Sequence, residues 1–429
     1  MSAMPGPQRG RSPKLLLGFV VFLFFAWGFA TVLLDTLVPK LKVLFSLSYT
    51  EVMLTQFSFF IGYFFFSIPA GFILSRLGYI RASILGLAIM AVGCLLFIPA
   101  TYVALFPAFL LALFIMASGI TLLQVVANPF IAELGPEESS HSRLTLAQAF
   151  NSLGTTIGPW VGAILILRTG VTAPRAGLSG QALAAARRAE VHSVQWPFVG
   201  IGVALLLLAF GFWLLRRNVA PAVSANMATF RALWALRTRS RLLLGAMAIF
   251  LYVGAEVSIG SLMTNYLMQR SVLGLSAPQA GKLVSLYWGG AMLGRFLGAF
   301  VLRRIKPGLV LAACAVCTTL LALLSSATTG EVAAVALIAV GLFNSIMFPT
   351  IFALACENLG EETPNGSALL CMAIVGGAIV PVLAGATADR FGLAPSLLVP
   401  AVCYLWILAY GLLTARGLGL QRNLYSAGS

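Results

Sequence analysis

A long run of apolar residues near the start of the chain limits the possible folds more than any other feature. Residues 15–34 read LLLGFVVFLFFAWGFATVLL, which has no charged side chain and is long enough to cross a bilayer as a helix. Similar runs recur through the 429 residues, of which 60% are hydrophobic and 9% charged. Soluble domains carry about 25% charged residues, so this chain cannot cover a water-facing surface. The sequence therefore predicts a polytopic membrane protein.

We expect an all-α fold with twelve membrane-spanning helices, because the apolar runs are separated by mostly short polar connections. The predicted spans are residues 15–36, 52–75, 81–100, 102–127, 144–168, 195–215, 242–268, 279–302, 308–326, 331–354, 366–387 and 394–415.

The spans form two groups of six, residues 15–215 and 242–415, joined by the basic segment 216–241 and flanked by tails at 1–14 and 416–429. This division predicts two six-helix halves linked by a loop near the middle of the chain.

Two proline-containing segments repeat in the same order in both halves. NPFIAELGPEESS (128–140) matches FPTIFALACENLGEET (348–363), and IGPWVGAIL (157–165) matches IVPVLAGAT (379–387). Same-order repeats indicate pseudo-symmetric halves related by an axis along the membrane normal. Transporters built in this way bind substrate near the membrane midplane, between the halves.

The net charge of +15 is explained by Lys and Arg residues in the loops, which membrane proteins carry mainly on the cytoplasmic side. With the N-terminus in the cytoplasm, the predicted cytoplasmic segments hold about twice as many Lys and Arg residues as the outer ones, which favours cytoplasmic N- and C-termini. The basic loop 169–194 opposes this assignment. We expect the lipid bilayer, and no nucleic acid, as the partner of this charge.

Several longer stretches resemble the major facilitator superfamily, in particular its branch of fucose permeases and glucose/galactose transporters. The stretches that carry the resemblance are WGFATVLLDTLVPKLK (27–42), SIPAGFILSRLGYIR (67–81), ASGITLLQVVANPF (117–130), RLTLAQAFNSLGTTIGP (143–159) and IFLYVGAEVSIGSLMTNYL (249–267). The resemblance covers about residues 15–415. It implies the major facilitator fold and transport of a sugar.

The chain departs from this family at two positions. The superfamily loop after the second span usually reads G-x-x-x-D-R-x-G, and here Ser75 replaces the Asp, which puts the gating ion pair of that Asp in doubt. Fucose permeases carry a Glu in the fourth span where this chain has Gln124. Gln124 cannot carry a proton, but it can donate to and accept from sugar hydroxyls.

Two acids, Asp35 at the end of the first span and Glu256 within the seventh, are the candidates for proton coupling. An ionisable group at the bilayer centre costs roughly 2.5–3.5 kcal/mol, so a sequence that keeps one is expected to use it. Desolvation favours the neutral carboxyl, which can then carry a proton. The resemblance agrees, since the acid at the Asp35 position is a coupling residue in fucose permeases. The alternatives are an interfacial Asp35 paired with Lys40 or Lys42, and a structural hydrogen bond for Glu256.

Uncharged polar residues form one helical stripe on each of the first, fourth and fifth spans, spaced three or four residues apart. Three stripes in one half predict a shared cavity whose amides and aromatic ring suit the hydroxyl rim and apolar face of a hexose. Interhelical hydrogen bonding is the alternative explanation for each stripe. The stripes are Trp27, Thr31 and Asp35; Thr121, Gln124 and Asn128; and Gln148, Asn151 and Thr155.

In the second half the candidate substrate-binding residues are Asn265, Tyr287 and Trp288, with Asn344 as a further candidate. Asn265 lies nine residues after Glu256, so both can line one cavity only if the helix breaks, for example at Gly260. Tyr and Trp are also common in the aromatic belts of membrane proteins.

The basic residue Arg295 also lies within a predicted span. We expect its long side chain to extend to the cytoplasmic membrane surface. A cavity without a buried cation argues against an anionic substrate.

These features predict a multi-pass transporter of the bacterial inner (plasma) membrane that imports a neutral monosaccharide by proton symport with alternating access. Within the same fold, the alternatives are a sodium-coupled sugar symporter and a multidrug exporter; outside it, a membrane receptor or scaffold. An enzyme is not expected, because His141 and His192 lie in loops and no nucleophile–base or metal-ligand spacing occurs. We expect no metal and no cofactor, a proton as coupling ion with sodium left open, and a monomer.

Overall fold

The computed structural model describes residues 13–134, 140–167, 181–216, 236–357, 359 and 362–416. The tails and most of the linker predicted at 1–14, 416–429 and 216–241 lie outside the described residues, so these predictions remain untested.

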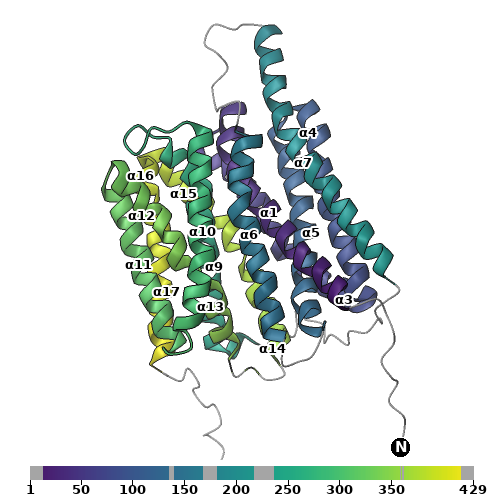
Figure 1. The fold of residues 1–429 in the computed structure, drawn as a ribbon. Coiled ribbons are helices and arrows are strands. Elements are labelled where there is room, and N and C mark those ends of the chain that lie inside the picture. Colours follow the sequence, from purple (N-terminus) through teal and green to yellow (C-terminus); the bar gives the residue numbers. More distant parts are fainter. Residues whose placement is uncertain are drawn as a thin grey trace, which may run out of the picture.

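The described residues are almost entirely helical (Figure 1). In the first half the helices are α1 (Pro13–Leu44), α2 (Tyr49–Val52), α3 (Leu54–Leu95), α4 (Phe97–Val103), α5 (Phe106–Glu133), α6 (Ser140–Leu165) and α7 (Gln181–Leu215). The second half follows a short 3-10 turn, η2 (Leu236–Thr238). It contains α9 (Ser240–Leu267), α10 (Ala277–Val301), α11 (Pro307–Ala327), α12 (Gly330–Asn344), α13 (Met347–Cys356), α14 (Thr363–Ala373), α15 (Gly376–Phe391), α16 (Leu393–Ser396) and α17 (Leu398–Ala415).

Ten helical stretches of the described residues are long and apolar enough to cross a membrane. One of them, Tyr49–Val103, is far too long for a single crossing, and its backbone leaves the helical conformation at Gly78, where φ is 72°. A Cβ atom at Gly62 or at Gly93 would touch the same turn of α5, near Met116 and Ala117. The chain therefore reverses at Gly78 and crosses twice.

The more polar α6 is the remaining crossing. It is 26 residues long and packs along α1 and α10. With the two limbs of α3 counted separately and α6 added, the described residues contain the twelve crossings that the sequence predicts.

Helices α1–α7 pack mainly on one another, as do α9–α17, and Figure 1 shows the two groups side by side. The main contacts within one half have counterparts in the other: α1 packs on α6 as α9 packs on α15, and α3 packs on α7 as α11 packs on α17. Between the halves, α6 packs on α10 and α3 packs on α15. These two contacts exchange under the sequence repeat, so the halves are related by a pseudo-twofold axis.

A row of glycines lets α6 approach the backbone of α1. A Cβ atom at Gly154 would lie 2.4 Å from the carbonyl oxygen of Phe25, and one at Gly158 would lie 2.3 Å from a methyl of Val32. Gly162 repeats the pattern against Thr36. Close helix contacts through small residues four apart are a common way to hold membrane helices together, so α1 and α6 form one rigid pair.

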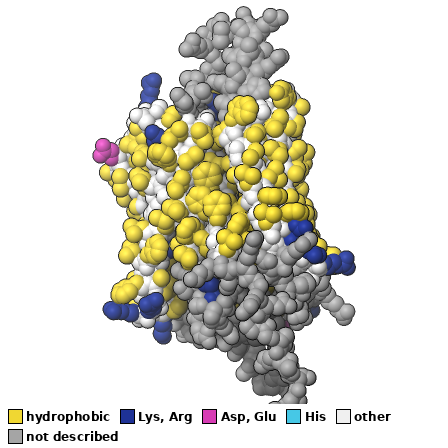
Figure 2. All heavy atoms as spheres, turned by 45° about the vertical axis from the view of Figure 1, so that its right-hand side comes forward, with side chains coloured by type: hydrophobic (Ala, Val, Ile, Leu, Met, Phe, Trp, Pro, Cys, Tyr) yellow, Lys and Arg dark blue, Asp and Glu magenta, His cyan; other side chains and the backbone are white. Residues whose placement is uncertain are grey.

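The face drawn in Figure 2 carries hydrophobic side chains across its middle and basic side chains toward its two ends. Large apolar residues are widely exposed, including Phe65, Leu207 and Phe300 at 59%, 67% and 58%. A soluble monomer rarely exposes so much contiguous apolar surface, whereas lipid tails would cover it.

We call the end of the bundle at which α1 finishes the α2 end; α4 and α16 also lie there, at the top of Figure 1. The opposite end, with α14, is the α14 end. The first span is longer than predicted, because α1 continues to Leu44 rather than ending near residue 36. Asp35 consequently lies inside a helix and within the bundle, which corrects its predicted place at the end of a span.

Candidate functional site

Asp35 joins the two halves through a short hydrogen-bond relay. Its side chain is only 5% exposed, and its Oδ1 accepts a hydrogen bond of 2.9 Å from the Ser261 hydroxyl of α9. The Ser261 oxygen in turn accepts a bond of 2.8 Å from Nε2 of Gln56, a buried residue of α3. Gln56, Ser261 and Asp35 thus connect three helices from both halves. The carboxylate contacts this serine instead of the alternative partner Lys42, whose ammonium donates to the Leu47 carbonyl.

Gly260 lets α9 approach Asp35 closely. A Cβ atom at this position would lie 3.1 Å from Asp35 Oδ2 and 3.4 Å from Cζ2 of Trp288 on α10. Gly260 therefore brings the predicted residues Asp35 and Trp288 to the same place. The indole N–H of Trp288 is buried and interacts with the Asp35 carboxyl group, which places this aromatic ring beside the acid.

Glu256 belongs to a second polar cluster, formed by α9, α10 and the end of α12. Its Oε1 lies 2.7 Å from the hydroxyl of Tyr252, one helical turn earlier, and the same hydroxyl lies 2.9 Å from the Asn344 carbonyl oxygen. Tyr287 donates to the Glu256 carbonyl at 3.4 Å and accepts from Nδ2 of Asn344 at 2.9 Å. The cluster brings together Glu256 and two of the second-half candidates, Tyr287 and Asn344.

The Tyr252 hydroxyl has a single hydrogen but two acceptors within reach. If Glu256 is ionised, Tyr252 can donate to only one of the carboxylate and the Asn344 carbonyl. If Glu256 carries a proton, the acid donates to Tyr252, and Tyr252 donates to Asn344. Both contacts can therefore be full two-centre hydrogen bonds at the same time only when Glu256 is protonated.

Arg295 does not extend to the membrane surface, which corrects the sequence-based expectation and removes the argument against an anionic substrate that depended on it. It is partly buried, and its guanidinium donates to the Ser152 hydroxyl of α6 and, at 3.4 Å, to the Ser345 carbonyl. It also interacts electrostatically with Glu256. The sequence could not show this, because the receiving serine lies in the other half.

The amides of the first half form a connected group along α5 and α6. Gln124 donates to the buried Tyr63 hydroxyl at 2.7 Å, and Asn128 donates to the Gln124 carbonyl at 3.1 Å. Gln148 of α6 reaches Asn128 Oδ1 at 3.5 Å. Two of the predicted stripes therefore meet.

Asn151 and Trp27 lie where α6 meets α1. Asn151 donates through Nδ2 to the Phe24 carbonyl at 3.0 Å, and a Cβ atom at Gly28 would lie 2.4 Å from its backbone oxygen. This contact is the interhelical hydrogen bond that was the alternative for the stripe, and it leaves the Asn151 side-chain oxygen for another donor. Trp27 is partly buried, with its ring 5.1 Å from that of Phe24.

Asn265 lies apart from Glu256. Helix α9 runs from Ser240 to Leu267 without a break at Gly260, so the condition for placing both residues on one face is not met. Asn265 instead follows Ser261 by one turn, and its Nδ2 is buried without a partner among the described residues. Asn265 therefore lies on the side of α9 that carries Ser261, away from Glu256.

An apolar cavity of about 630 Å³ lies away from these residues, between α1, α6 and α7. Its lining includes Phe22, Phe29 and Trp196, with Phe22 and Trp196 49% and 70% exposed. It contains neither candidate carboxyl group, so we place the functional site at the polar clusters between the halves.

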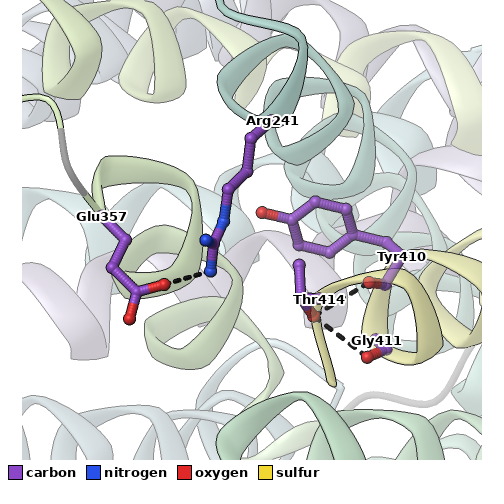
Figure 3. Close-up of polar contacts among 5 residues, drawn as sticks. All are labelled: Arg241, Glu357, Tyr410, Gly411 and Thr414. Atoms are coloured by element: carbon purple, nitrogen blue, oxygen red, sulfur yellow. Dashed lines mark hydrogen bonds and ion pairs between the residues drawn. The ribbon is translucent and has the colours of Figure 1, made fainter. Parts of the chain in front are cut away.

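Two ion pairs lie at the start of α9, within the second half. Arg241 pairs with Glu357, and Arg239 pairs with Glu362 at 2.7 Å. In Figure 3, Arg241 points toward Glu357 with the Tyr410 ring beside it. These pairs fasten α9 to the segments after α13 and do not cross between the halves.

The comparisons with known proteins agree with this architecture. The model of the Major Facilitator Superfamily matches residues 15–370. A glucose/galactose transporter of Brucella abortus biovar 1 is 46% identical over 401 residues, which cover 92% of this chain and 93% of the relative. The L-fucose-proton symporter of Escherichia coli K12 is 36% identical over 411 residues, with 92% of each chain covered.

Among solved structures, the superfamily transporter FucP in the outward conformation has a TM-score of 0.71 at 34% identity, covering 94% of this chain and 99% of the other. A bacterial homologue of the lysosomal transporter Spinster also has a TM-score of 0.71, but at 14% identity it supports only the fold. The chain belongs to the Major Facilitator Superfamily. It is a membrane transport protein rather than an enzyme, and the resemblance seen in the sequence is confirmed.

Proposed function

We propose that this protein is a secondary active transporter that imports a neutral monosaccharide together with a proton by alternating access. The observation that carries the proposal is the position of two carboxyl groups, one from each half, inside the membrane part of the bundle. Asp35 of α1 and Glu256 of α9 belong to different halves, and each contacts a hydroxyl of α9. The glucose/galactose and fucose specificities of the relatives support a sugar as the cargo.

The two carboxyl groups are suited to couple proton binding to the arrangement of the helices. The hydrogen bond between Asp35 and Ser261 depends on the relative position of the halves, because Ser261 belongs to the other half. Glu256 ties α9 to the end of α12 through Tyr252, and that link is complete only with a proton on the acid. A ligand shifts a conformational equilibrium only if it binds the two states differently, and these contacts supply such a difference for the proton.

The sugar would bind between the polar clusters. Gln124, Asn128, Gln148 and Asn151 offer amide groups from the first half. From the second half, Asn265 contributes a buried amide N–H group that has no partner among the described residues. Trp288 lies beside Asp35 and beside Tyr287, whose ring centroid is 5.2 Å from its own. The aromatic ring of Trp27 completes a site for a molecule with hydroxyls and apolar faces.

We place the protein in the bacterial inner membrane as a monomer, with both termini in the cytoplasm. The excess of basic residues in the segments then predicted to be cytoplasmic supports this orientation. The α2 end would face outward and the α14 end inward.

The proposal is tested with purified protein in lipid vesicles and a panel of radiolabelled glucose, galactose and fucose under an imposed pH gradient. We expect uptake of at least one of these sugars and alkalinisation of the medium on the side from which the sugar enters. Accumulation that requires a sodium gradient and ignores the pH gradient would instead indicate sodium symport. Export of hydrophobic cations without sugar uptake would indicate a multidrug exporter, and no transport at all would favour a receptor or scaffold.

Replacing Glu256 by glutamine is expected to uncouple transport without abolishing sugar exchange. The amide can donate to Tyr252 as the protonated acid does, but it cannot release a proton. Sugar accumulation under a pH gradient of about one unit should fall from about tenfold toward equilibrium, since about 1.4 kcal/mol corresponds to a factor of ten. Exchange of external for internal sugar should continue.

The matched control for this variant is Glu331→Gln, which neutralises an exposed acid in the first turn of α12. It should leave accumulation unchanged. If Glu256→Gln accumulates sugar as well as the unmodified protein does, Glu256 has only a structural role.

A further inference from the structure

A carboxylate at the end of α15 holds the opposite half of the protein at the α2 end. Asp389 Oδ1 accepts a hydrogen bond of 2.6 Å from the Tyr49 N–H, and Oδ2 accepts bonds from the Thr50 N–H at 2.7 Å and the Thr50 hydroxyl at 2.6 Å. The partners are about 340 residues apart in sequence and belong to different halves. Hydrogen bonds to a charged acceptor are stronger than neutral ones, so this contact favours the closed arrangement of the α2 end.

The local sequence of α2 prepares its start for this contact. Ser48 and Glu51 form a capping box, in which Glu51 accepts from the Ser48 N–H at 2.8 Å and Ser48 accepts from the Glu51 N–H at 3.1 Å. The capping box leaves the N–H groups of Tyr49 and Thr50, which have no acceptor within α2. Asp389 takes both. The first turn of α2 is therefore satisfied partly by its own half and partly by the other.

The local sequence of α15 has the matching features. Gly385 lies one turn before Asp389, and a Cβ atom there would lie 2.6 Å from the Tyr49 carbonyl oxygen. Gly392 ends the helix with φ at +97°, a conformation that glycine adopts without strain. Residues 385–392 thus have the spacing G-x-x-x-D-R-x-G, and this copy keeps the acid that Ser75 replaces in the loop after the second span.

The hydrogen bonds between Asp389 and the start of α2 lie where they can break during a conformational change. Asp389, Tyr49 and Thr50 are exposed or only partly buried, and all three hydrogen bonds lie near the surface. When the halves separate, water can replace each partner, so no buried group is left unsatisfied. By contrast, water cannot take the place of the close packing at the glycine-lined interfaces within a half.

We infer that Asp389 is a gating residue of the transport cycle, whose carboxylate latches α2 of one half to α15 of the other and must release α2 before the cavity can open at the α2 end. The inference relies on the proposed function only for alternating access. Asp389 acts by positioning the two halves and need not touch the transported molecule.

The test measures the distance between the halves without any sugar or ion gradient. Spin labels are attached at Leu105→Cys, at the start of α5, and at Leu398→Cys, at the start of α17, with the native cysteines replaced. Both positions are exposed at the α2 end, at 58% and 45%, and belong to different halves. Asp389→Asn is expected to raise the ratio of long to short distances about tenfold or more, because a charged acceptor shared by three donors is lost.

Three further variants make the result specific. Asp389→Glu should return the ratio at least part of the way, and Arg390→Gln, a change of the neighbouring exposed charge, should leave it unchanged. Thr50→Ala removes one of the three bonds and should shift the ratio in the same direction as Asp389→Asn, but by a smaller factor. If Asp389→Asn does not fold, the Thr50→Ala result tests the inference by itself. An unchanged ratio in Asp389→Asn and Thr50→Ala, or an equal change in Arg390→Gln, would overturn the inference. Failure of sugar uptake alone would affect only the proposed function.

Discussion

The Asp35→Asn variant is expected to lose gradient-driven sugar accumulation while it still exchanges sugar across the membrane. Asparagine keeps an oxygen that can accept from Ser261, so the contact between the halves survives. It cannot bind and release a proton, so the pH gradient no longer does work on the sugar. With about one pH unit imposed, the ratio of internal to external sugar should fall from about ten to about one, because each pH unit corresponds to about 1.4 kcal/mol per proton.

The measurement combines accumulation under the gradient with sugar exchange at equal pH on both sides. Exchange reports binding and the movement of the halves, and accumulation reports coupling. Asp35→Asn combined with Glu256→Gln should also exchange sugar without accumulating it. If the double variant still concentrates sugar against its gradient, neither acid carries the coupled proton and the proposed mechanism is wrong.

Replacing Gly154 by alanine is expected to destabilise the first half severely for so small a change. The new methyl would lie 2.4 Å from the Phe25 carbonyl oxygen and 2.8 Å from the Phe29 nitrogen, both backbone atoms of α1 that cannot move aside as a side chain can. Overpacking of this kind typically costs about 1–3 kcal/mol. The apparent midpoint of thermal unfolding in detergent, together with the yield of monodisperse protein, measures the effect.

Gly200→Ala is the matched control, because a methyl at this position of α7 would meet no atom within 4 Å. It should change the unfolding midpoint little or raise it slightly, since alanine favours a helix over glycine. Equal midpoints for the two variants would mean that α1 and α6 separate easily, and the rigid pair described above would not exist.

The sequence predicted the number of crossings and the division into halves, because long apolar runs and repeated proline segments depend only on local composition. It misplaced the end of the first helix. Asp35 and Lys40 look like the polar edge of a membrane span, yet they are 5% and 1% exposed, and α1 continues to Leu44. Neighbouring helices from both halves bury these residues, and a single sequence does not show which helices meet.

The candidate site could be predicted in composition but not in its connections. Asp35, Glu256 and Gln124 stand out as polar residues in apolar runs. Their partners Gln56 and Ser261 were missed, although a Gln in a predicted span was a usable signal. The four-residue spacing of Tyr252 and Glu256 could also have indicated that their side chains meet on one helix face. The contact of Arg295 with Ser152 depends on how α6 meets α10, which only the folded structure reveals.

The relay from Gln56 through Ser261 to Asp35 has a consequence for how fast such a protein can work. In the proposed transport cycle, this contact depends both on the protonation of Asp35 and on the contact between the halves. A stronger hydrogen bond between Ser261 and Asp35 would make conformational changes without both proton and sugar bound rarer, but it would also lengthen each transport cycle. A weaker hydrogen bond would speed the cycle and would allow protons to be transported without sugar. Under the proposed function, the strength of this one serine–carboxylate contact therefore sets a compromise between the rate of turnover and the leak of protons.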